Sequence, residues 1–137
     1  GYGQGREQPP IRDGVVMLEQ VSDTGSTGYL FSQPIVRDGA GTQCRLDELL
    51  GPGFALVTRR GDVTLSDKSR RIFERLGGRE VSLEGLETVR GRFDRLFTEA
   101  TMAIVRPDRL VFGHTTDRLS PDALIGALSE RLALIEN

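Results

Sequence analysis

The chain has 137 residues, of which 37% are hydrophobic and 28% charged, with a net charge of −2 and one cysteine. These values favour one packed domain and exclude wholesale disorder, an internal disulfide and a strongly basic nucleic-acid binder. No apolar run approaches the roughly 20 residues that span a bilayer, so we expect a cytoplasmic protein without a membrane or nucleic-acid partner.

Residues 1–28 differ in composition from the rest of the chain. They hold six glycines, a Pro9-Pro10 pair and a single apolar cluster at Val15–Leu18. This composition predicts a linker or tail that arrives from upstream domains, in which the apolar cluster is available to dock. A frayed terminus is the alternative that the residues leave open. Residues 29–137 then form the domain itself.

The first half of the domain alternates between extended and turn-forming residues. Residues 30–36 are predicted to be extended, and Pro34 is expected to keep them at a sheet edge or outside a sheet. The continuous apolar run at 54–59 predicts a strand that is buried on both faces. Between them we expect a turn at 38–41, a short strand at 43–45 and a helical turn at 46–50 that Gly51-Pro52-Gly53 ends.

Ser66 predicts the start of a helix, because serine is a preferred N-cap and Asp67 follows in the first turn. Ile72, Phe73 and Leu76 share one face of this helix, and Gly77-Gly78 ends it. The pattern then predicts a strand at 79–83, a helix at 92–99, and a hairpin of strands 102–106 and 110–114 around Pro107-Asp108-Arg109.

The last element is a capped helix. Ser120 is the expected N-cap and Pro121 the first helical residue. Its apolar stripe is expected to lie on a sheet, and it consists of Leu124, Leu128, Leu132 and Ile135. The order β-α-β-α-β-α-β-β-α predicts an α/β, thioredoxin-like fold: a mixed central sheet with helices on both faces and a C-terminal hairpin plus helix.

A redox-active thioredoxin fold carries Cys-x-x-Cys at the start of the helix after the central strand, where the helix N-terminus lowers the thiol pKa. The matching stretch here is Arg60–Ser66, which contains no cysteine. The proline that this fold places before its penultimate strand would fall near Ala100 or Thr101, and neither residue is proline. Cys44 lies in an earlier strand, where a lone cysteine is typically a small apolar residue.

Other residue groupings are weaker still. His114, Asp117 and Ser120 suggest a catalytic triad, but Ser120 is already explained as a helix cap, and residues of one short loop rarely adopt nucleophile–base geometry. No spacing of histidines, cysteines or carboxylates supports a metal site. We therefore predict no catalytic, cofactor-binding or metal-binding residue in this chain.

Three stretches together resemble a known family. Residues 28–34, Gly-Tyr-Leu-Phe-Ser-Gln-Pro, are similar to the G-x-L-F-P-Q-P segment of the C-terminal domain of FAD-dependent aromatic hydroxylases, of the 3-(3-hydroxyphenyl)propionate hydroxylase and phenol hydroxylase type. Residues 46–56 resemble its L-D-D-x-L-G-x-G-F-A-L segment, and residues 105–111 its V-R-P-D-x-x-V segment. Ser32 departs from the pattern, since the family usually has proline there.

The resemblance implies that the chain is a redox-inactive accessory domain at the C-terminus of a monooxygenase. That parent would use FAD, NAD(P)H and O2 to hydroxylate a phenolic ring, and its FAD and substrate domains would be the partners of this domain. A contribution to a homodimer is also implied. Two alternatives remain: a stand-alone thioredoxin-fold interaction module, and a thiol-dependent redox enzyme that uses Cys44.

Overall fold

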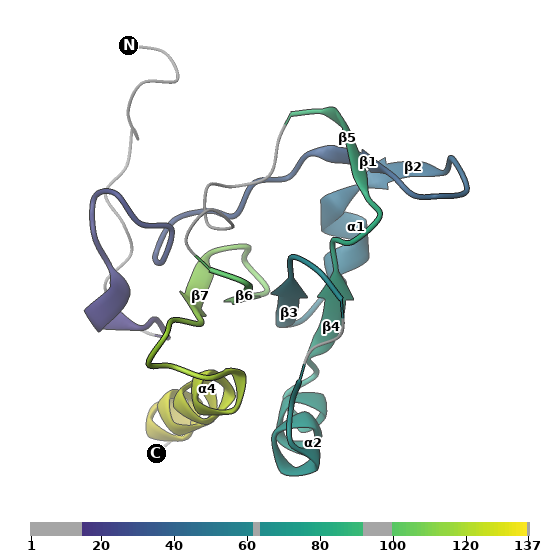
Figure 1. Cartoon of the computed structure of the whole chain (residues 1–137). Coiled ribbons are helices and arrows are strands. Elements are labelled where there is room, and N and C mark those ends of the chain that lie inside the picture. The colour runs from purple at the N-terminus through teal and green to yellow at the C-terminus, as the bar shows by residue number, and fades with distance from the viewer. Residues whose placement is uncertain (1–14, 62–63, 92–99, 137) are drawn as a thin grey trace.

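The computed structural model describes residues 15–61, 64–91 and 100–136, and these residues form two β-sheets with helices packed against them (Figure 1). One sheet has four strands in the order β4-β3-β6-β7, and the other has three in the order β2-β1-β5. The strands are β1 (Ile35–Arg37), β2 (Gln43–Arg45), β3 (Ala55–Thr58), β4 (Arg79–Ser82), β5 (Glu87–Arg90), β6 (Met102–Val105) and β7 (Val111–His114). The helices are η1 (Leu18–Gln20), α1 (Leu46–Leu50), α2 (Asp67–Arg75) and α4 (Pro121–Glu136).

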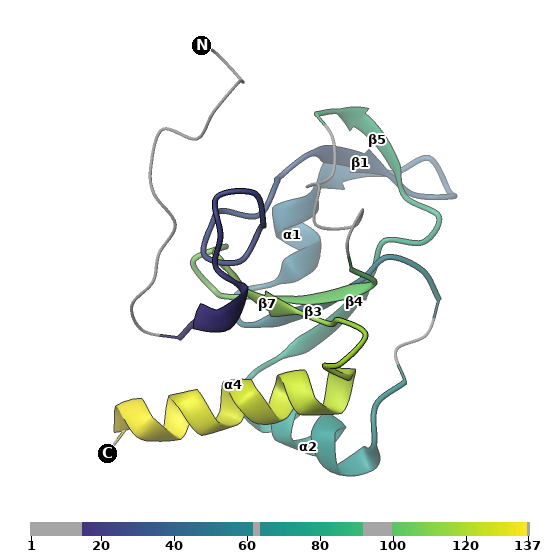
Figure 2. The ribbon, with the colours of Figure 1, turned by 60° about the vertical axis from the view of Figure 1, so that its left-hand side comes forward.

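The four-stranded sheet is mixed, because β3 runs parallel to β4 and antiparallel to β6. Helix α1 lies on one face of this sheet, and α2 and α4 lie on the other (Figure 2). Alternate residues of β3 serve the two faces: Ala55 and Val57 join the hydrophobic cluster around α1, whereas Leu56 joins the cluster that includes Phe73 of α2 and Leu128 of α4. Every residue of β3 is buried, as predicted for a strand covered on both faces.

Most of the predicted elements are confirmed within one or two residues. The Ser66 side chain accepts a hydrogen bond from the backbone N–H of Ser69 and caps α2, and the Ser120 hydroxyl does the same for Ala123 in α4. The predicted helix at 92–99 lies outside the described residues. The mixed central sheet, the helices on both of its faces, and the C-terminal hairpin plus helix are all present.

The prediction for residues 30–36 was wrong in one respect. Residues 31–34 lie outside the strands, as one of the two predicted alternatives had it, but Ile35 and Val36 belong to β1, which is the middle strand of the small sheet and not an edge. The small sheet itself, including β5, was not predicted. Only residues 46–54 separate β2 from β3, and a crossover between parallel strands of one sheet needs a dozen or more residues. This short connection is the reason that β2 and β3 lie in different sheets.

The apolar stripe of α4 is only partly buried. Leu124 and Leu128 are fully buried and Leu132 packs against the same cluster, but Ile135 is 62% exposed. A helix of 16 residues is about 24 Å long, so its last turn passes beyond the sheet that it covers (Figure 2). The expected contact of Ile135 with the sheet is therefore absent.

Residues 15–29 cover the outer edge of β7. Met17 donates its backbone N–H to the carbonyl of Phe112, and Val111 exchanges backbone hydrogen bonds with Gly28 and Tyr29. The amide of Gln20 extends this ladder with its side chain, donating to the carbonyl of His114 and accepting from its N–H. An uncovered edge strand would offer unpaired backbone groups to other chains, so this segment protects the sheet.

Candidate functional site

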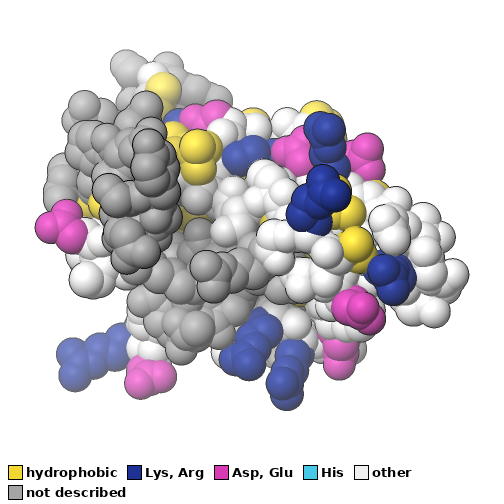
Figure 3. Space-filling model, turned by 90° about the horizontal axis from the view of Figure 1, so that it is seen from above, with side chains coloured by type: hydrophobic (Ala, Val, Ile, Leu, Met, Phe, Trp, Pro, Cys, Tyr) yellow, Lys and Arg dark blue, Asp and Glu magenta, His cyan; other side chains and the backbone are white. Residues whose placement is uncertain are grey.

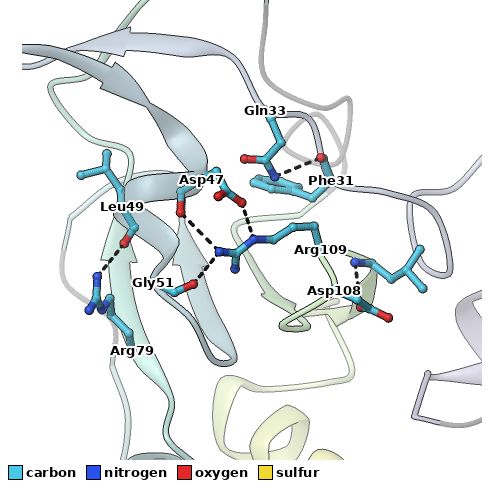
Figure 4. Close-up of polar contacts among 9 residues, drawn as sticks. Phe31, Gln33, Asp47, Leu49, Gly51, Arg79, Asp108 and Arg109 are labelled. Carbon is cyan, nitrogen blue, oxygen red and sulfur yellow. Dashed lines mark hydrogen bonds and ion pairs between the residues drawn. The ribbon is translucent and has the colours of Figure 1, made fainter.

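The three stretches that carry the family resemblance meet at one residue, Arg109, through its side chain and its backbone carbonyl (Figure 4). Arg109 lies in the β6–β7 turn, and its guanidinium group reaches α1 and the residue that ends it. Its backbone carbonyl accepts a hydrogen bond of 2.7 Å from the N–H of Phe31. We call this group the Arg109 junction; its members are Phe31, Asp47, Gly51 and Arg109.

The guanidinium group of Arg109 binds both ends of the short helix α1, at Asp47 in its first turn and at Gly51, the residue that ends it. Nε donates to Oδ1 of Asp47 at 2.6 Å, while Nη2 donates to the carbonyls of Asp47 and Gly51. The side chain of Arg109 is 15% exposed, whereas that of Asp47 is 51% exposed. The last carbonyls of a helix lack intrahelical partners, so a cation placed there satisfies them and opposes the negative end of the helix dipole.

The hairpin turn holds Arg109 in a backbone conformation that places its side chain against α1. Its N–H donates to the carbonyl of Arg106, as expected for the predicted turn, and its φ is 72°, in the left-handed region. A residue in that region after a type I turn is typical of a three-residue hairpin loop. Asp108 supports the loop by accepting from the backbone N–H of Leu110 and from the guanidinium group of Arg106.

A second arginine also binds the C-terminal part of α1. Arg79 of β4 donates to the carbonyl of Leu49 at 3.2 Å, from an exposed position. The chemistry of the Arg109 junction is therefore helix capping, since its groups are hydrogen-bond donors, carbonyl acceptors and one paired carboxylate. Arrangements of this kind position a helix; they do not activate a nucleophile.

The place that carries the thiols in redox-active thioredoxin folds lies between β3 and α2. Of the residues 60–66, the structure describes 60, 61 and 64–66. Gly61 donates its N–H to the carboxylate of Glu84, and Ser66 caps α2. Next to the end of β3, where Arg59 donates its N–H to the carbonyl of Thr101, the hydroxyls of Thr101 and Thr115 lie 3.3 Å apart. No peptide bond among the described residues is cis.

Asp122 joins the N-termini of α2 and α4. Its Oδ1 accepts a hydrogen bond of 2.9 Å from the backbone N–H of Ser66. This bond, followed by hydrogen bonds from the Ser69 and Ser66 side chains, lowers the pKa of the Asp122 carboxyl below its ordinary value. The ionised form of Asp122 therefore stabilises the contact between the two helices.

Replacing Asp122 with asparagine is expected to remove a pH-dependent contribution to stability. Because the folded-state pKa is lowered, the advantage of the wild type over D122N is full above the ordinary aspartate pKa of about 3.9 and shrinks as the pH falls through the lower folded value. Urea unfolding of both proteins between pH 7 and pH 3 measures this gap. A gap of constant size over the whole range would contradict the role of Asp122.

His114, Asp117 and Ser120 do not form a triad. His114 is 9% exposed in β7, and its Nδ1 lies 2.9 Å from the carbonyl oxygen of Thr115. The Ser120 hydroxyl is engaged by Ala123 of α4, and no hydrogen bond within the described ranges joins Ser120 or Asp117 to His114.

Cys44 lies in β2 of the small sheet. It is opposite Val36 of β1 and half-buried, in a different sheet from the strand that feeds α2. Histidine, cysteine and carboxylate side chains of the described ranges form no group of three that could hold a metal ion. Among the helices of those same ranges, none combines the length and hydropathy that crossing a bilayer requires.

A family model described as the HcaD C-terminal domain matches residues 28–130. The chain belongs to this family. The matched residues contain all three stretches that carry the family resemblance. Together with the hydroxylase relatives and the solved hydroxylase structure that follow, the match confirms the resemblance to the C-terminal domain of FAD-dependent aromatic hydroxylases.

Two curated relatives are hydroxylases in which this HcaD C-terminal domain occupies a small part. The 3-(3-hydroxy-phenyl)propionate/3-hydroxycinnamic acid hydroxylase of Paraburkholderia xenovorans (strain LB400) is 33% identical over 127 residues, covering 78% of this chain and 20% of the relative. The 3-(3-hydroxy-phenyl)propionate/3-hydroxycinnamic acid hydroxylase 2 of Burkholderia vietnamiensis (strain G4 / LMG 22486) is 28% identical over 135 residues, covering 80% and 24%. The chain thus spans about a fifth to a quarter of these relatives.

Two solved structures share the fold of the HcaD C-terminal domain. Aklavinone-11 hydroxylase, solved as a ternary complex with FAD and aklavinone, superposes with a TM-score of 0.58 at 20% identity over 90% of this chain and 26% of that one. Peroxidoxin BcpB from Mycobacterium tuberculosis superposes with a TM-score of 0.53 at 15% identity over 82% of this chain and 99% of that one. The thioredoxin-like fold prediction is confirmed.

Sequence reasoning identified the three motif stretches of this HcaD C-terminal domain but not the contacts between them. Arg109 was interpreted as a turn residue, whereas its side chain is the centre of the junction. A charged residue in a tight turn, with an acidic residue at the start of a short helix elsewhere, is too common a pattern to predict a pairing. The docking of residues 15–29 on β7 left no signal beyond the apolar cluster at Val15–Leu18.

Proposed function

We propose that this chain is a redox-inactive accessory domain of an FAD-dependent, NAD(P)H-using monooxygenase that hydroxylates an aromatic ring. In this proposal, residues 29–137 form the domain and residues 1–28 arrive from upstream FAD and substrate domains, against which the domain packs. A contribution to a homodimer and a cytoplasmic location belong to the same proposal. The fold-related aklavinone-11 hydroxylase, which was solved with FAD, supports flavin as the cofactor of the parent.

The observation that carries this proposal is the convergence of the three family stretches on the Arg109 junction. Phe31, Asp47 and Gly51 match specified positions of the family pattern, whereas Arg109 stands at a position that the pattern leaves open. Residues of a catalytic site would be expected to gather around a nucleophile, a base or a cofactor. Here they hold α1, the β6–β7 hairpin and the segment before β1 together. The share of the hydroxylase relatives that the chain spans supports a role inside a longer polypeptide.

The isolated chain and the full reading frame that encodes it together test the proposal. We expect an upstream FAD fingerprint in the same frame, a flavin-loaded full-length protein, and no change in flavin fluorescence when FAD is titrated into the 137-residue chain. Deleting the domain is expected to lower the Tm of the full-length protein while its FAD remains bound.

Two results would contradict the proposed function. Flavin that comigrates with the 137-residue chain through gel filtration would show a binding site in the domain itself. A reading frame that starts shortly before residue 1 would favour a stand-alone interaction module instead. Alkylation of Cys44 separates the remaining alternative, because a thiol-dependent enzyme would lose its activity in a peroxide or insulin reduction assay.

A further inference from the structure

The outer face of the small sheet carries an uneven distribution of charge. Strand pairing places Arg45 and Arg90 on either side of Ile35, one from β2 and the other from β5. The β1–β5 pairing shifts register between Ile35 and Val36, yet Arg45 and Arg90 both line the pocket beside Ile35. Two strand spacings put the Cα atoms of the two arginines roughly 10 Å apart. Arg37 lies in the next row, between Gln43 and Glu87. Figure 3 looks onto this side of the molecule and shows basic side chains (dark blue) beside hydrophobic and acidic ones.

The two arginines that flank Ile35 line one pocket. Its volume is about 440 Å³, and the described residues around it include Ser32, Gln33, Pro34, Ile35, Arg45 and Arg90. Pro34 is buried and Ile35 half-buried, so the floor is apolar, while Arg45 and Arg90 are exposed at the rim. The pocket is shallow and open to solvent, but it combines the two features that orient a small ligand, an apolar lining and a few polar groups.

Arg45 and Arg90 differ from the other arginine of this face. Arg37 is paired with Glu87, at 3.7 Å between Nη1 and Oε1. Within the described part of the chain, no hydrogen bond or ion pair engages the guanidinium group of Arg45 or of Arg90. Two like charges flanking one residue of a sheet repel each other, so an anion bound between them would relieve the repulsion.

Guanidinium groups favour a particular class of anion. Their planar fork of donors matches the two oxygens of a carboxylate, and the same plane stacks on aromatic rings. A carboxylate on a flat ring would place its charge between the two arginines and its ring on the floor formed by Pro34 and Ile35. Compact inorganic anions match the charges but leave the apolar floor in contact with water.

We propose that the pocket between Arg45 and Arg90 binds small aryl carboxylates. The site lies on the small sheet, apart from the Arg109 junction, and nothing in the proposed structural role of the domain requires it. Binding at an open site is expected to be weak, with a Kd on the order of 1 mM at low ionic strength, because exposed ion pairs contribute little each and salt screens them.

Titration of the 137-residue chain with benzoate, followed by backbone amide NMR shifts, tests the site. We expect saturable shifts centred on the amides of residues 32, 33, 35, 45 and 90. Benzamide, which has the same shape without the charge, is expected to bind about tenfold more weakly, and raising the salt concentration should weaken benzoate binding. Inorganic phosphate should produce weaker shifts than benzoate, because it cannot use the apolar floor.

Variants on the same sheet face provide the matched control. R45Q and R90Q are each expected to weaken benzoate binding about tenfold, whereas R37Q, which removes an equal charge outside the pocket, should change it less than about twofold. All three residues lie at the surface, and circular dichroism checks that each variant folds. The assay needs neither flavin nor a parent enzyme, so its outcome is independent of that of the proposed function.

Several results would overturn the proposal. These are shifts that do not saturate by about 20 mM benzoate, equal binding of benzoate and benzamide, or equal losses in R37Q and R45Q. Binding of N-acetylglutamate N-methylamide as tight as that of benzoate would also overturn it, because the pocket would then receive an acidic side chain of a protein instead of an aryl acid.

Discussion

Replacing Arg109 with alanine is expected to lower the free energy of unfolding by about 2–4 kcal/mol. The substitution removes the hydrogen bonds to Asp47 and Gly51 and leaves the carbonyl at the end of α1 without its donor. The guanidinium group is largely buried, so water replaces these bonds poorly. Urea unfolding of the 137-residue chain at pH 7 measures the change, and a loss below about 0.5 kcal/mol would contradict a structural role for Arg109.

Three further variants separate the contributions of backbone strain, helix capping and the ion pair to the stability of this junction. Arg109→Gly loses the same hydrogen bonds but accepts the φ of 72° without strain, so it should be about 1 kcal/mol more stable than Arg109→Ala. Arg79→Ala removes an exposed cap of the same helix and should cost less than about 1 kcal/mol. Asp47→Asn keeps both carbonyl acceptors of Arg109 and is expected to cost a similarly small amount.

Replacing Gly53 with alanine is expected to destabilise the fold by about 2–3 kcal/mol. A Cβ atom at this position would lie 2.6 Å from the carbonyl oxygen of Gly77, a backbone atom that cannot rotate away. This close contact lies where β3 and β4 begin to pair, and there the N–H of Arg79 donates to the carbonyl of Phe54. Moving the segment at Gly53 away from the segment at Gly77 would weaken the pairing of β3 with β4, which is the only parallel pairing of the described strands.

The control for Gly53 is Gly39, at which an added Cβ meets nothing within 4 Å. Gly39→Ala is therefore expected to change stability by less than about 0.5 kcal/mol. Hydrogen exchange gives a local readout, since the amide of Arg79 should exchange faster in Gly53→Ala than in the wild type. Equal stability of the two variants would show that the backbone at Gly77 can move at little cost.

Elements with strong local signals could be predicted from the sequence. The apolar run at 54–57 indicated a doubly covered strand, and β3 is buried along its whole length. Ser66 and Ser120 indicated helix starts because their hydroxyls replace hydrogen-bond partners that the first turn lacks. The sequence also shows that no cysteine lies between Arg60 and Ser66. The fold prediction identified this stretch as the place where a redox-active thioredoxin fold carries its thiols.

Features that depend on partners distant in the chain could not be predicted. β1 is a central strand because β5, about fifty residues later in the chain, pairs with it. The residues Ile35–Arg37 carry no pattern that predicts this pairing. The side chain of Gln20 completes the ladder of β7 across 94 residues. Ile135 fits the helical stripe by spacing, but only the length of α4 relative to the sheet leaves it exposed.

The sequence by itself therefore determined the order of most helices and strands, their caps, and the three stretches that mark the family. These depend on residues within one or two turns of each other, where spacing fixes geometry. Only the tertiary structure decided that the stretches meet at Arg109, whose partners Asp47 and Gly51 are 62 and 58 residues away. It also brought Arg45 and Arg90 to one pocket, because strand register sets which side chains share a face. In short strands the sequence specifies this register only weakly.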